Sequence, residues 1–258
     1  MRYAGIDLGS RTIKLVVVDQ AGSIVVSKSA DTTFHPLRQA ESLLQDVEYD
    51  EIQATGYGRN LYVEASNTPV VSEIIAHAAG AVAIAPDAKA ILDIGGQDTK
   101  VIAINQFQKV QKFEMNDRCA AGTGKFLEVM SRAFGIDIEE FGNFALTGEK
   151  PLKISNMCTV FAESEATSLM AKGAKPENIA LGLHQSIVKR SVLMLRRVCR
   201  ENPVVFTGGV ALNPCMCKLI IDELGENVIF PENPQITGAF GAALLLRDEI
   251  QSAKADKT

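Results

Sequence analysis

Asp7-Leu8-Gly9-Ser10-Arg11-Thr12-Ile13-Lys14 is a stretch that returns in altered form as Asp93-Ile94-Gly95-Gly96-Gln97-Asp98-Thr99-Lys100. The offset between the copies is constant at 86 residues, since 93 − 7 = 86. In each copy an apolar strand ends in an aspartate, a glycine-containing turn follows, and a second apolar strand begins. Two such hairpins predict two related half-domains, each of which presents a turn to a ligand between them. The repeat therefore indicates a nucleotide cleft.

The composition argues against several classes of partner. The chain has 258 residues and 47% apolar residues, enough for a well-buried α/β protein near the size at which one core divides into two. A net charge of -5 without a basic run argues against nucleic acids and anionic membranes. The longest apolar stretch, about residues 74–85, is shorter than the roughly 20 residues of a spanning helix. Because the chain opens directly into a predicted strand rather than a signal peptide, we expect a cytoplasmic protein.

Predicted strands and helices follow one another in two similar blocks. Expected strands occupy residues 3–7, 13–19, 23–28, 52–55, 90–94, 100–105, 109–115, 203–207 and 227–230. Expected helices occupy residues 37–47, 72–84, 213–224 and 236–248, and others begin at about Cys119, Cys158 and Pro176. This order indicates two ribonuclease-H-like α/β lobes. We expect the first lobe at 1–86 and the second at 87–235, with a closing helix at about 236–250 that packs back on the first.

The glycine turns have the features of phosphate-binding turns. A tight turn at Gly9 and Ser10 exposes backbone N–H groups that bind phosphate without a side-chain charge, and Lys14 adds a positive charge beyond the turn. One such turn is equally well an ordinary hairpin, but two copies at matching positions favour a nucleotide site. The chain contains no G-x-x-x-x-G-K-[ST] motif, so the predicted site is not a P-loop.

Side chains beside these turns are candidates for catalysis and nucleotide binding. We expect Asp7 and Asp93, at the ends of facing strands, to hold Mg²⁺ through water, because Mg²⁺ keeps much of its hydration shell. Gln97 is a candidate for orienting the attacking water, and such positioning is most of what phosphoryl transfer requires. A third glycine turn suits the adenosine side. It comprises Thr207, Gly208 and Gly209, and the start of the last helix completes it with Gln235, Thr237 and Gly238.

Two cysteines are candidate iron ligands. Polar residues that favour helix caps precede Cys119 and Cys158, and a helical pattern follows each, so both thiols are expected near helix N-termini, where the helix dipole favours thiolate. The alternative for each is a small buried apolar residue. A [4Fe–4S] cluster normally takes four thiolates, and a two-fold dimer of a chain with two would supply all four.

The other cysteines and histidines give weaker signals. Five cysteines in a chain that we expect to be cytoplasmic make disulfides unlikely to form. Cys215-x-Cys217 is a competing metal site, although helix packing explains it as well, and Cys199 is expected in a helix core. The three histidines are scattered, which argues against zinc.

Four motifs along the chain resemble those of one known family. DIGGQDTK, NDRCAAGTGKFLE, SNMCTVFAESE and TGGVALN resemble the activator ATPases of 2-hydroxyacyl-CoA dehydratases, the family that also holds the ATP-hydrolysing subunits of benzoyl-CoA reductase. The resemblance covers essentially the whole chain and includes ATGYGR at residues 54–59. The cysteine motifs are specific to this family, whereas actin, Hsp70 and sugar kinases share the phosphate turns.

The resemblance implies a fold, a cofactor and a set of partners. It implies the acetate-and-sugar-kinase/Hsp70/actin fold, ATP and ADP binding with Mg²⁺, and a homodimer bridged by one [4Fe–4S] cluster on Cys119 and Cys158 of each chain. It implies ATP-driven transfer of one electron from ferredoxin or flavodoxin to a dehydratase-like iron–sulfur protein. By matching position, the nucleotide site comprises Ser10, Arg11, Thr12, Ile13, Lys14, Gly95, Gly96, Gln97, Thr207, Gly208, Gly209 and the segment from Gln235 to Gly238.

Two other functions fit parts of the sequence. A small-molecule kinase of the same fold explains the turns, but the chain shows neither an insertion for an acceptor nor an acceptor-side base. An actin-like assembly protein explains the turns and leaves the cysteines without a role. Three side chains also have alternative roles. One of Glu163 and Glu165, just after Cys158, either contacts the partner or tunes the cluster, or both lie on a solvated helix face. Arg59 either faces the phosphates or pins its own glycine turn.

Overall fold

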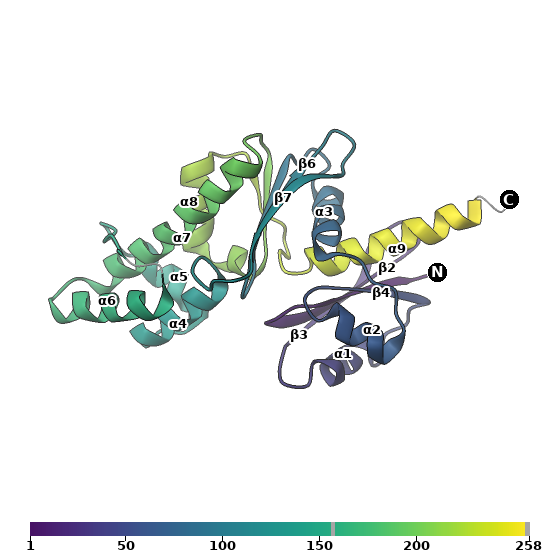
Figure 1. The fold of residues 1–258 in the computed structure, drawn as a ribbon, viewed down its shortest axis with the longest axis horizontal. Helices are drawn as coiled ribbons and strands as arrows, with labels where there is room; N and C mark the ends of the chain where they lie inside the picture. Colours follow the sequence, from purple (N-terminus) through teal and green to yellow (C-terminus); the bar gives the residue numbers. More distant parts are fainter. Residues whose placement is uncertain (156–157, 256–258) are drawn as a thin grey trace. The chain divides into compact units, whose positions relative to one another are not determined.

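Two compact units, each built on its own sheet, make up the protein (Figure 1). The computed structural model describes residues 1–155 and 158–255, so Asn156 and Met157 of the second cysteine motif lie outside the described residues. Unit 1 combines Met1–Ala88, Ile104–Gln111 and the segment from Gln235 onward, and unit 2 combines Lys89–Ala103 and Lys112–Pro234. No helix of the described residues is both long enough and apolar enough to cross a membrane.

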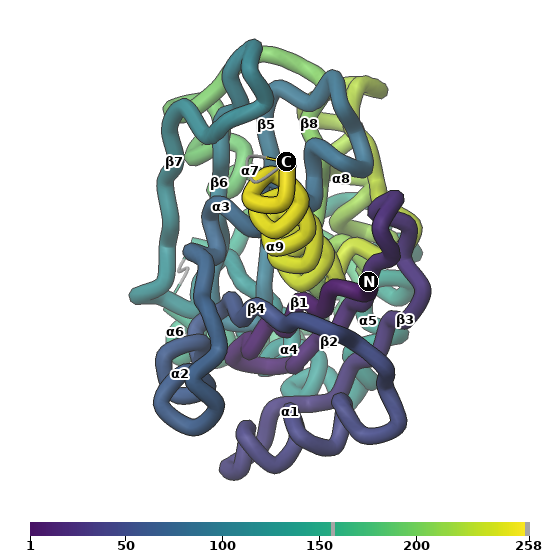
Figure 2. The backbone as a smooth tube through the Cα atoms, turned by 90° about the vertical axis from the view of Figure 1, so that its right-hand side faces the viewer, coloured from purple at the N-terminus to yellow at the C-terminus, as the bar shows by residue number. Residues whose placement is uncertain are grey.

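Unit 1 is a four-stranded sheet with helices on both faces. The strand order is β3 (Ile24–Asp31), β2 (Thr12–Val18), β1 (Tyr3–Leu8) and β4 (Glu51–Thr55), and only β1 and β4 run parallel. Every residue of β1 is buried, as expected for a central strand covered on both faces. The helices α1 (Pro36–Leu44) and α2 (Arg59–Ser66) cover one face, and α3 (Glu73–Ile84) and α9 (Thr237–Ala255) lie on the other (Figure 2).

Glycines allow α9 to pack very closely in unit 1. A Cβ atom on Gly5 of β1 would lie 2.0 Å from the carbonyl oxygen of Ala239, and one on Gly80 of α3 would lie 2.1 Å from that of Thr237. A Cβ atom on Gly241 of α9 would likewise lie 1.8 Å from the carbonyl oxygen of Ala76. Any side chain at these positions would push α9 away from β1 or α3. The glycines therefore place the first turn of α9 against β1 and α3.

Unit 2 is a five-stranded sheet with a helical layer. The strand order is β7 (Val110–Asn116), β6 (Thr99–Ile104), β5 (Ala90–Ile94), β8 (Val204–Thr207) and β9 (Val228–Ile229). The helices are α4 (Gly124–Phe134), α5 (Ile138–Leu146), α6 (Thr159–Ala171), α7 (Pro176–Val198) and α8 (Pro214–Leu224), with a 3-10 turn, η1, at Gly209–Leu212. One large apolar core joins them, and Phe126, Phe141 and Phe206 are its largest buried side chains.

The predicted strands are confirmed, but two helix boundaries were wrong and two helices were not predicted. Helix α4 begins at Gly124 rather than near Cys119, because Gly122 has a φ of +92° and the chain turns there first. Helix α1 ends at Leu44, just before Asp46, whose φ of +60° is incompatible with a helix. Helices α2 and α5 were not predicted. Asp137 at the N-cap and two glutamates in the first turn were an available signal for α5.

A buried histidine links three helices of unit 2. His184 of α7 is fully buried, its Nδ1 lies 2.8 Å from the carbonyl oxygen of Ala180, and its Nε2 lies 3.1 Å from the amide nitrogen of Asn213. Its ring also packs on Phe141 of α5. An imidazole that donates from Nδ1 and accepts at Nε2 is neutral. Burial lowers the pKa of His184 from 6.5 to about 4.

We expect unit 2 to lose stability on acidification because of His184. The folded state resists protonation down to a pKa of about 4, whereas the unfolded chain takes up the proton at 6.5, so stability falls as the pH drops from 6.5 towards 4. The loss from this residue is about 3 kcal/mol in the free energy of unfolding. Denaturant titrations at a series of pH values measure it. The His184→Gln variant should lose most of this pH dependence, and an unchanged slope would contradict the prediction.

Candidate functional site: two aspartate–lysine hairpins

The sequence repeat is also a repeat of strand register. Asp7 lies opposite Lys14 across β1 and β2, and Asp93 lies opposite Lys100 across β5 and β6. On its other side each aspartate faces a threonine on a parallel strand, Thr55 in unit 1 and Thr207 in unit 2. The glycine after each threonine has nearly the same left-handed backbone, with φ of +89° at position 56 and +88° at position 208. The same four-part arrangement therefore occurs in both units.

The glycine turn at Thr55 is a part of this arrangement that sequence reasoning did not identify. Thr-Gly directly follows a strand in both places, and that shared dipeptide was the available signal. Gly56 is required there, because a Cβ atom would lie 2.2 Å from Oδ1 of Asp7. A Cβ atom on Gly208 would equally lie 2.3 Å from the carbonyl oxygen of Ile94. Both turns can approach the adjacent aspartate strand only without a side chain.

In unit 1 the arrangement gathers charge at the end of β1. Asp7 is 4% exposed, and its Oδ2 lies 3.4 Å from Nζ of Lys14. A Cβ atom on Gly238, at the start of α9, would lie 2.8 Å from Cε1 of His77 and 3.3 Å from Oδ2 of Asp7. Gly238 therefore allows the start of α9 to pack closely against His77 and Asp7. A buried carboxylate paired with a lysine beside a glycine turn suits a hydrated Mg²⁺ ion and a phosphate.

The turn after β1 directs its backbone outward. Thr32 fixes two carbonyl groups of this turn. Its hydroxyl donates a hydrogen bond to the carbonyl oxygen of Gly9 at 2.8 Å, and its backbone N–H donates one to the carbonyl oxygen of Arg11 at 2.8 Å. Within the described residues the N–H of Ser10 has no hydrogen-bond partner, and the same is true of Gly96 and Gln97 in the second turn. Both turns thus offer unpaired N–H donors to a phosphate.

In unit 2 the aspartate has more partners. Asp93 is 3% exposed, its Oδ2 accepts a hydrogen bond from the Thr207 hydroxyl at 2.8 Å, and its Oδ1 lies 3.5 Å from Nζ of Lys100. Lys100 also lies 2.5 Å from Oδ2 of Asp98. Gln97 is exposed at the tip of the same turn. Buried Asp93 and exposed Gln97 are compatible with a metal-binding and a water-orienting role, respectively.

The two threonines differ in one hydrogen bond, and this difference predicts unequal effects of substitution. Thr207→Val removes the hydroxyl bonded to buried Asp93 and should lower the free energy of unfolding by about 1–3 kcal/mol. Thr55→Val is the matched control, because the buried Thr55 hydroxyl has no hydrogen-bond partner among the described residues, and we expect no loss of stability. Guanidinium denaturation of both variants measures the difference. Equal losses would show that the Asp93 bond does not stabilise the fold.

The second glycine turn, at Gly95 and Gly96, is hydrogen-bonded to α4 and to the loop that carries Cys119. The carbonyl groups of Gly95 and Gly96 accept hydrogen bonds from the N–H groups of residues 124 and 125, at 2.9 and 2.7 Å. The buried hydroxyl of Thr99 donates to the carbonyl oxygen of Gly122 at 2.9 Å. Helix α4 has no side-chain cap, so the turn itself supplies acceptors for its first N–H groups. Three hydrogen bonds therefore join this hairpin to α4 and its preceding loop.

Both candidate iron ligands are exposed free thiols, but only one lies at a helix terminus. Cys158 is the N-cap of α6. Cys119 lies in the loop before α4, so the prediction of a thiol at a helix start was wrong for this residue. The loop is held instead by Asn116, whose side-chain amide donates to the carbonyl oxygen of Cys119 at 3.1 Å. Residues 116–123 thus form a short loop that is bonded at both ends.

The remaining cysteines have structural surroundings. Cys215 is completely buried, and burial raises the pKa of its thiol to about 12. Burial also raises the pKa of Cys217 to about 11, and its thiol donates to the carbonyl oxygen of Ala211 at 3.1 Å. These surroundings disfavour thiolates and support helix packing over metal binding. Cys199 was expected in a helix core, but it is the half-buried residue that follows α7.

The structure shows a contact for each of two charged side chains, and the contact of Glu165 is none of its expected roles. Both carboxylate oxygens of Glu165 accept the backbone N–H of Ser155, at 2.9 and 3.0 Å, so this residue anchors the segment before Cys158. Arg59 donates to the carbonyl oxygen of Gly56 at 2.9 Å and therefore pins its own turn. The other predicted nucleotide-site residues fall in different units: Ser10 to Lys14 and Gln235 to Gly238 belong to unit 1, and Gly95 to Gln97 and Thr207 to Gly209 belong to unit 2.

Two α/β units, each with an aspartate–lysine hairpin beside a glycine turn, define an ATPase of the acetate-and-sugar-kinase/Hsp70/actin fold. Residues 4–245 match the BadF/BadG/BcrA/BcrD ATPase family, and the chain belongs to this family.

Named relatives share the full length of the chain. The 2-hydroxyisocaproyl-CoA dehydratase activator of Clostridioides difficile is 37% identical over 98% of both chains. The (R)-2-hydroxyglutaryl-CoA dehydratase activating ATPase of Acidaminococcus fermentans is 36% identical over 93% of this chain and 95% of its own. A solved structure of the Clostridium difficile activator with bound ADPNP has a TM-score of 0.90 at 37% identity, covering 99% of this chain and 98% of that one.

Proposed function

We propose that this ATPase activates a 2-hydroxyacyl-CoA dehydratase-like iron–sulfur enzyme by passing it one low-potential electron, supplied by ferredoxin or flavodoxin. The observation that carries the proposal is the set of hydrogen bonds between the second phosphate turn and the Cys119 loop. A kinase or an assembly protein has no use for such a link between a nucleotide turn and an exposed thiol. The full-length relatives named as dehydratase activators support the same function.

The proposed nucleotide site uses the two hairpins for different tasks. The free N–H groups of Ser10, Gly96 and Gln97 bind phosphate oxygens, and Lys14 and Lys100 contribute positive charge. Asp7 and Asp93 would hold a Mg²⁺ ion through water, and the ion would neutralise charge on the phosphates. Gln97 orients the attacking water. Thr207 to Gly209 serve the adenosine side together with Gln235 and Gly238.

The two exposed cysteines fit an iron–sulfur cluster shared between two chains. Thiolates are the ligands that such clusters take, and Cys119 and Cys158 are free and exposed, on segments that precede packed helices α4 and α6. No group of three or more metal-binding side chains gathers among the described residues, so one chain offers fewer than the usual four ligands. A symmetric homodimer would supply two cysteines from each subunit. The cluster would provide one-electron chemistry at the subunit interface.

Nucleotide-dependent movement of the second turn would change the cluster's surroundings. Gly95 and Gly96 hold the first turn of α4, and Thr99 holds the loop at Gly122. If Cys119 and Cys158 of each subunit held the cluster at the interface, a shift of this loop would change the angle between the two subunits' helices. Closure of two domains around a ligand, which rearranges a subunit interface, is a known form of conformational switching.

The proposal is tested by anaerobic purification followed by an activation assay. We expect a brown homodimer with one [4Fe–4S] cluster per two chains, and ATP-dependent activation of a 2-hydroxyacyl-CoA dehydratase in the presence of reduced ferredoxin. A colourless protein after anaerobic reconstitution would overturn the cluster. A coloured dimer that reduces its partner equally well without ATP would overturn the coupling.

We expect Thr99→Val to separate hydrolysis from activation. The substitution keeps the shape of the side chain and removes the hydrogen bond to the carbonyl oxygen of Gly122. Loss of about 1.4 kcal/mol of coupling should lower ATP-dependent dehydratase activation about tenfold, with hydrolysis by the isolated protein little changed. Thr147→Val is the matched control, because it removes a similar hydroxyl-to-carbonyl bond at the end of α5. If both variants activate alike, the Thr99 bond does not transmit the signal.

A further inference from the structure

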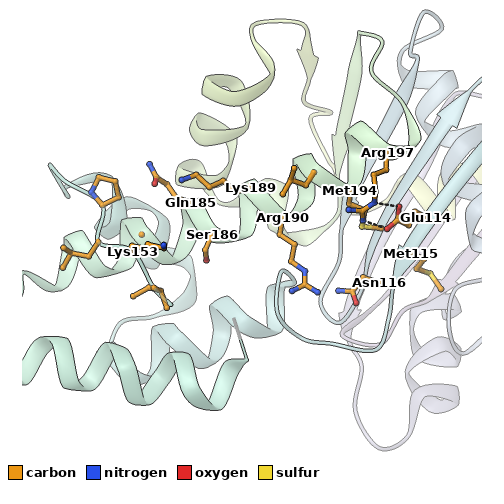
Figure 3. Close-up of a pocket in the computed structure, with 15 residues that line it drawn as sticks. Glu114, Met115, Asn116, Lys153, Gln185, Ser186, Lys189, Arg190, Met194 and Arg197 are labelled. Atoms are coloured by element: carbon orange, nitrogen blue, oxygen red, sulfur yellow. Dashed lines mark hydrogen bonds and ion pairs between the residues drawn. The ribbon is translucent and has the colours of Figure 1, made fainter. Parts of the chain in front are cut away.

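A basic groove in unit 2 is a feature that the proposed ATP and cluster sites do not explain. It encloses about 850 Å³ between the end of β7, the segment 151–154 and one face of α7 (Figure 3). Its charged lining comprises Lys153, Lys189, Arg190, Arg197 and Glu114, a net charge of +3 from four positive side chains and one negative one. The whole chain carries -5, so positive charge is concentrated locally against the overall balance.

Three of these cations are available to bind a partner. Arg197 is committed, since it forms a two-point ion pair with Glu114. Lys153, Lys189 and Arg190 are exposed, and none has an ion-pair partner among the described residues (Figure 3). Between them lies an apolar surface that includes Leu193, which is 59% exposed. An open apolar surface rimmed by unpaired positive charge is complementary to an acidic protein face.

The groove borders the loop that carries Cys119. Asn116 lines the groove and donates a hydrogen bond to the carbonyl oxygen of Cys119. Arg190 lies against the same loop, since a Cβ atom on Gly122 would be 3.4 Å from Cδ of Arg190. A protein seated here would therefore lie beside the loop of one candidate cluster ligand.

We propose that this groove docks a small acidic one-electron carrier protein, the donor that reduces the cluster. The inference rests on the proposed function, because it places the donor beside the proposed cluster. In the transfer step one electron leaves the reduced carrier and one is gained at the cluster, without a proton or a bond change. The unpaired lysines guide the acidic face into the groove, and Arg190 brings that face to the Cys119 loop.

The test compares two charge-reversed proteins of equal net charge. Lys153→Glu with Lys189→Glu alters the groove, and Lys109→Glu with Lys218→Glu is the control, because these exposed lysines lie outside it. Stopped-flow reduction by a reduced acidic bacterial ferredoxin is measured at several salt concentrations. We expect the groove variant to react at least about tenfold more slowly at low salt and to lose most of the salt dependence, with the control like the wild type. Both variants should be reduced normally by titanium(III) citrate.

A second measurement separates this inference from the proposed function. Binding of oxidised ferredoxin to cluster-free protein by calorimetry should persist in the control variant and be lost in the groove variant, whether or not a cluster assembles. Absence of a cluster in the wild type would instead overturn the proposed function. Equal ferredoxin binding by both variants would overturn the docking site. A groove variant that fails to dimerise would assign the groove to a second copy of the chain. A groove variant that fails to activate the dehydratase with titanium(III) citrate as the reductant would assign the groove to the dehydratase. Either result would overturn the donor assignment.

Discussion

Cys119→Ala and Cys158→Ala should each abolish the [4Fe–4S] cluster while leaving nucleotide binding largely intact. Each substitution removes two of the four proposed thiolates from a homodimer, because the two-fold axis repeats the loss. Both thiols are exposed, so truncation removes little buried surface and the fold should persist. Iron and sulfide analysis and the visible spectrum after anaerobic reconstitution measure the cluster. Calorimetry with ADP measures nucleotide binding.

The matched control for these variants is Cys199→Ala. Cys199 is a half-buried cysteine of the same unit, and its thiol lies 3.7 Å from the carbonyl oxygen of Lys89. The control should assemble the cluster like the wild type. A Cys119→Ala or Cys158→Ala protein with full cluster content would remove these residues from the ligand set. Loss of the cluster in Cys199→Ala as well would indicate a general effect on folding.

Asp93→Asn should lower the rate of ATP hydrolysis about 100-fold, through loss of charge stabilisation around Mg²⁺ worth several kcal/mol. Asparagine keeps the shape of the side chain and an oxygen for the Thr207 hydroxyl, so the buried geometry is retained. The substitution removes the negative charge that faces Lys100 and the proposed metal. Phosphate release at saturating Mg²⁺ and ATP measures the effect.

Asp222→Asn is the control for the loss of charge at Asp93. Asp222 also pairs with a lysine in unit 2, at 2.8 Å from Lys218, but the pair is exposed on α8. Exposed pairs of this kind contribute little to stability, so this variant should hydrolyse ATP at the wild-type rate. If Asp93→Asn hydrolyses ATP as fast as Asp222→Asn, Asp93 has no role in metal binding.

Much of the fold could be predicted from local patterns. The apolar strands, the aspartate at the end of each first strand and the constant offset between the copies are visible without a structure. The helix start at Gly124 was missed because it depends on the left-handed backbone of Gly122, whose conformation is decided by packing. Helix α2 was missed because only Tyr62 of its residues is buried, so its apolar pattern is weak.

The functional residues were predictable to different degrees. The aspartates, the glycine turns and Cys119 and Cys158 were chosen as candidates from residue type and spacing, and their roles stay predictions. The Thr55–Gly56 turn was overlooked, because its relation to Thr207–Gly208 becomes evident only when both threonines lie beside an aspartate across parallel strands. The role of Glu165 was also undecided, since its hydrogen bonds to Ser155 join residues ten positions apart.

The sequence by itself determined the existence of two related α/β units, the family, and the two motifs that contain the exposed cysteines. These follow from side-chain chemistry and from periodicity along the chain, which are local properties. Only the tertiary structure decided that the second phosphate turn is bonded to the Cys119 loop, and that Lys153, Lys189 and Arg190 surround one groove. Both depend on contacts between segments distant in sequence, which form when the core of unit 2 packs and which no local pattern encodes.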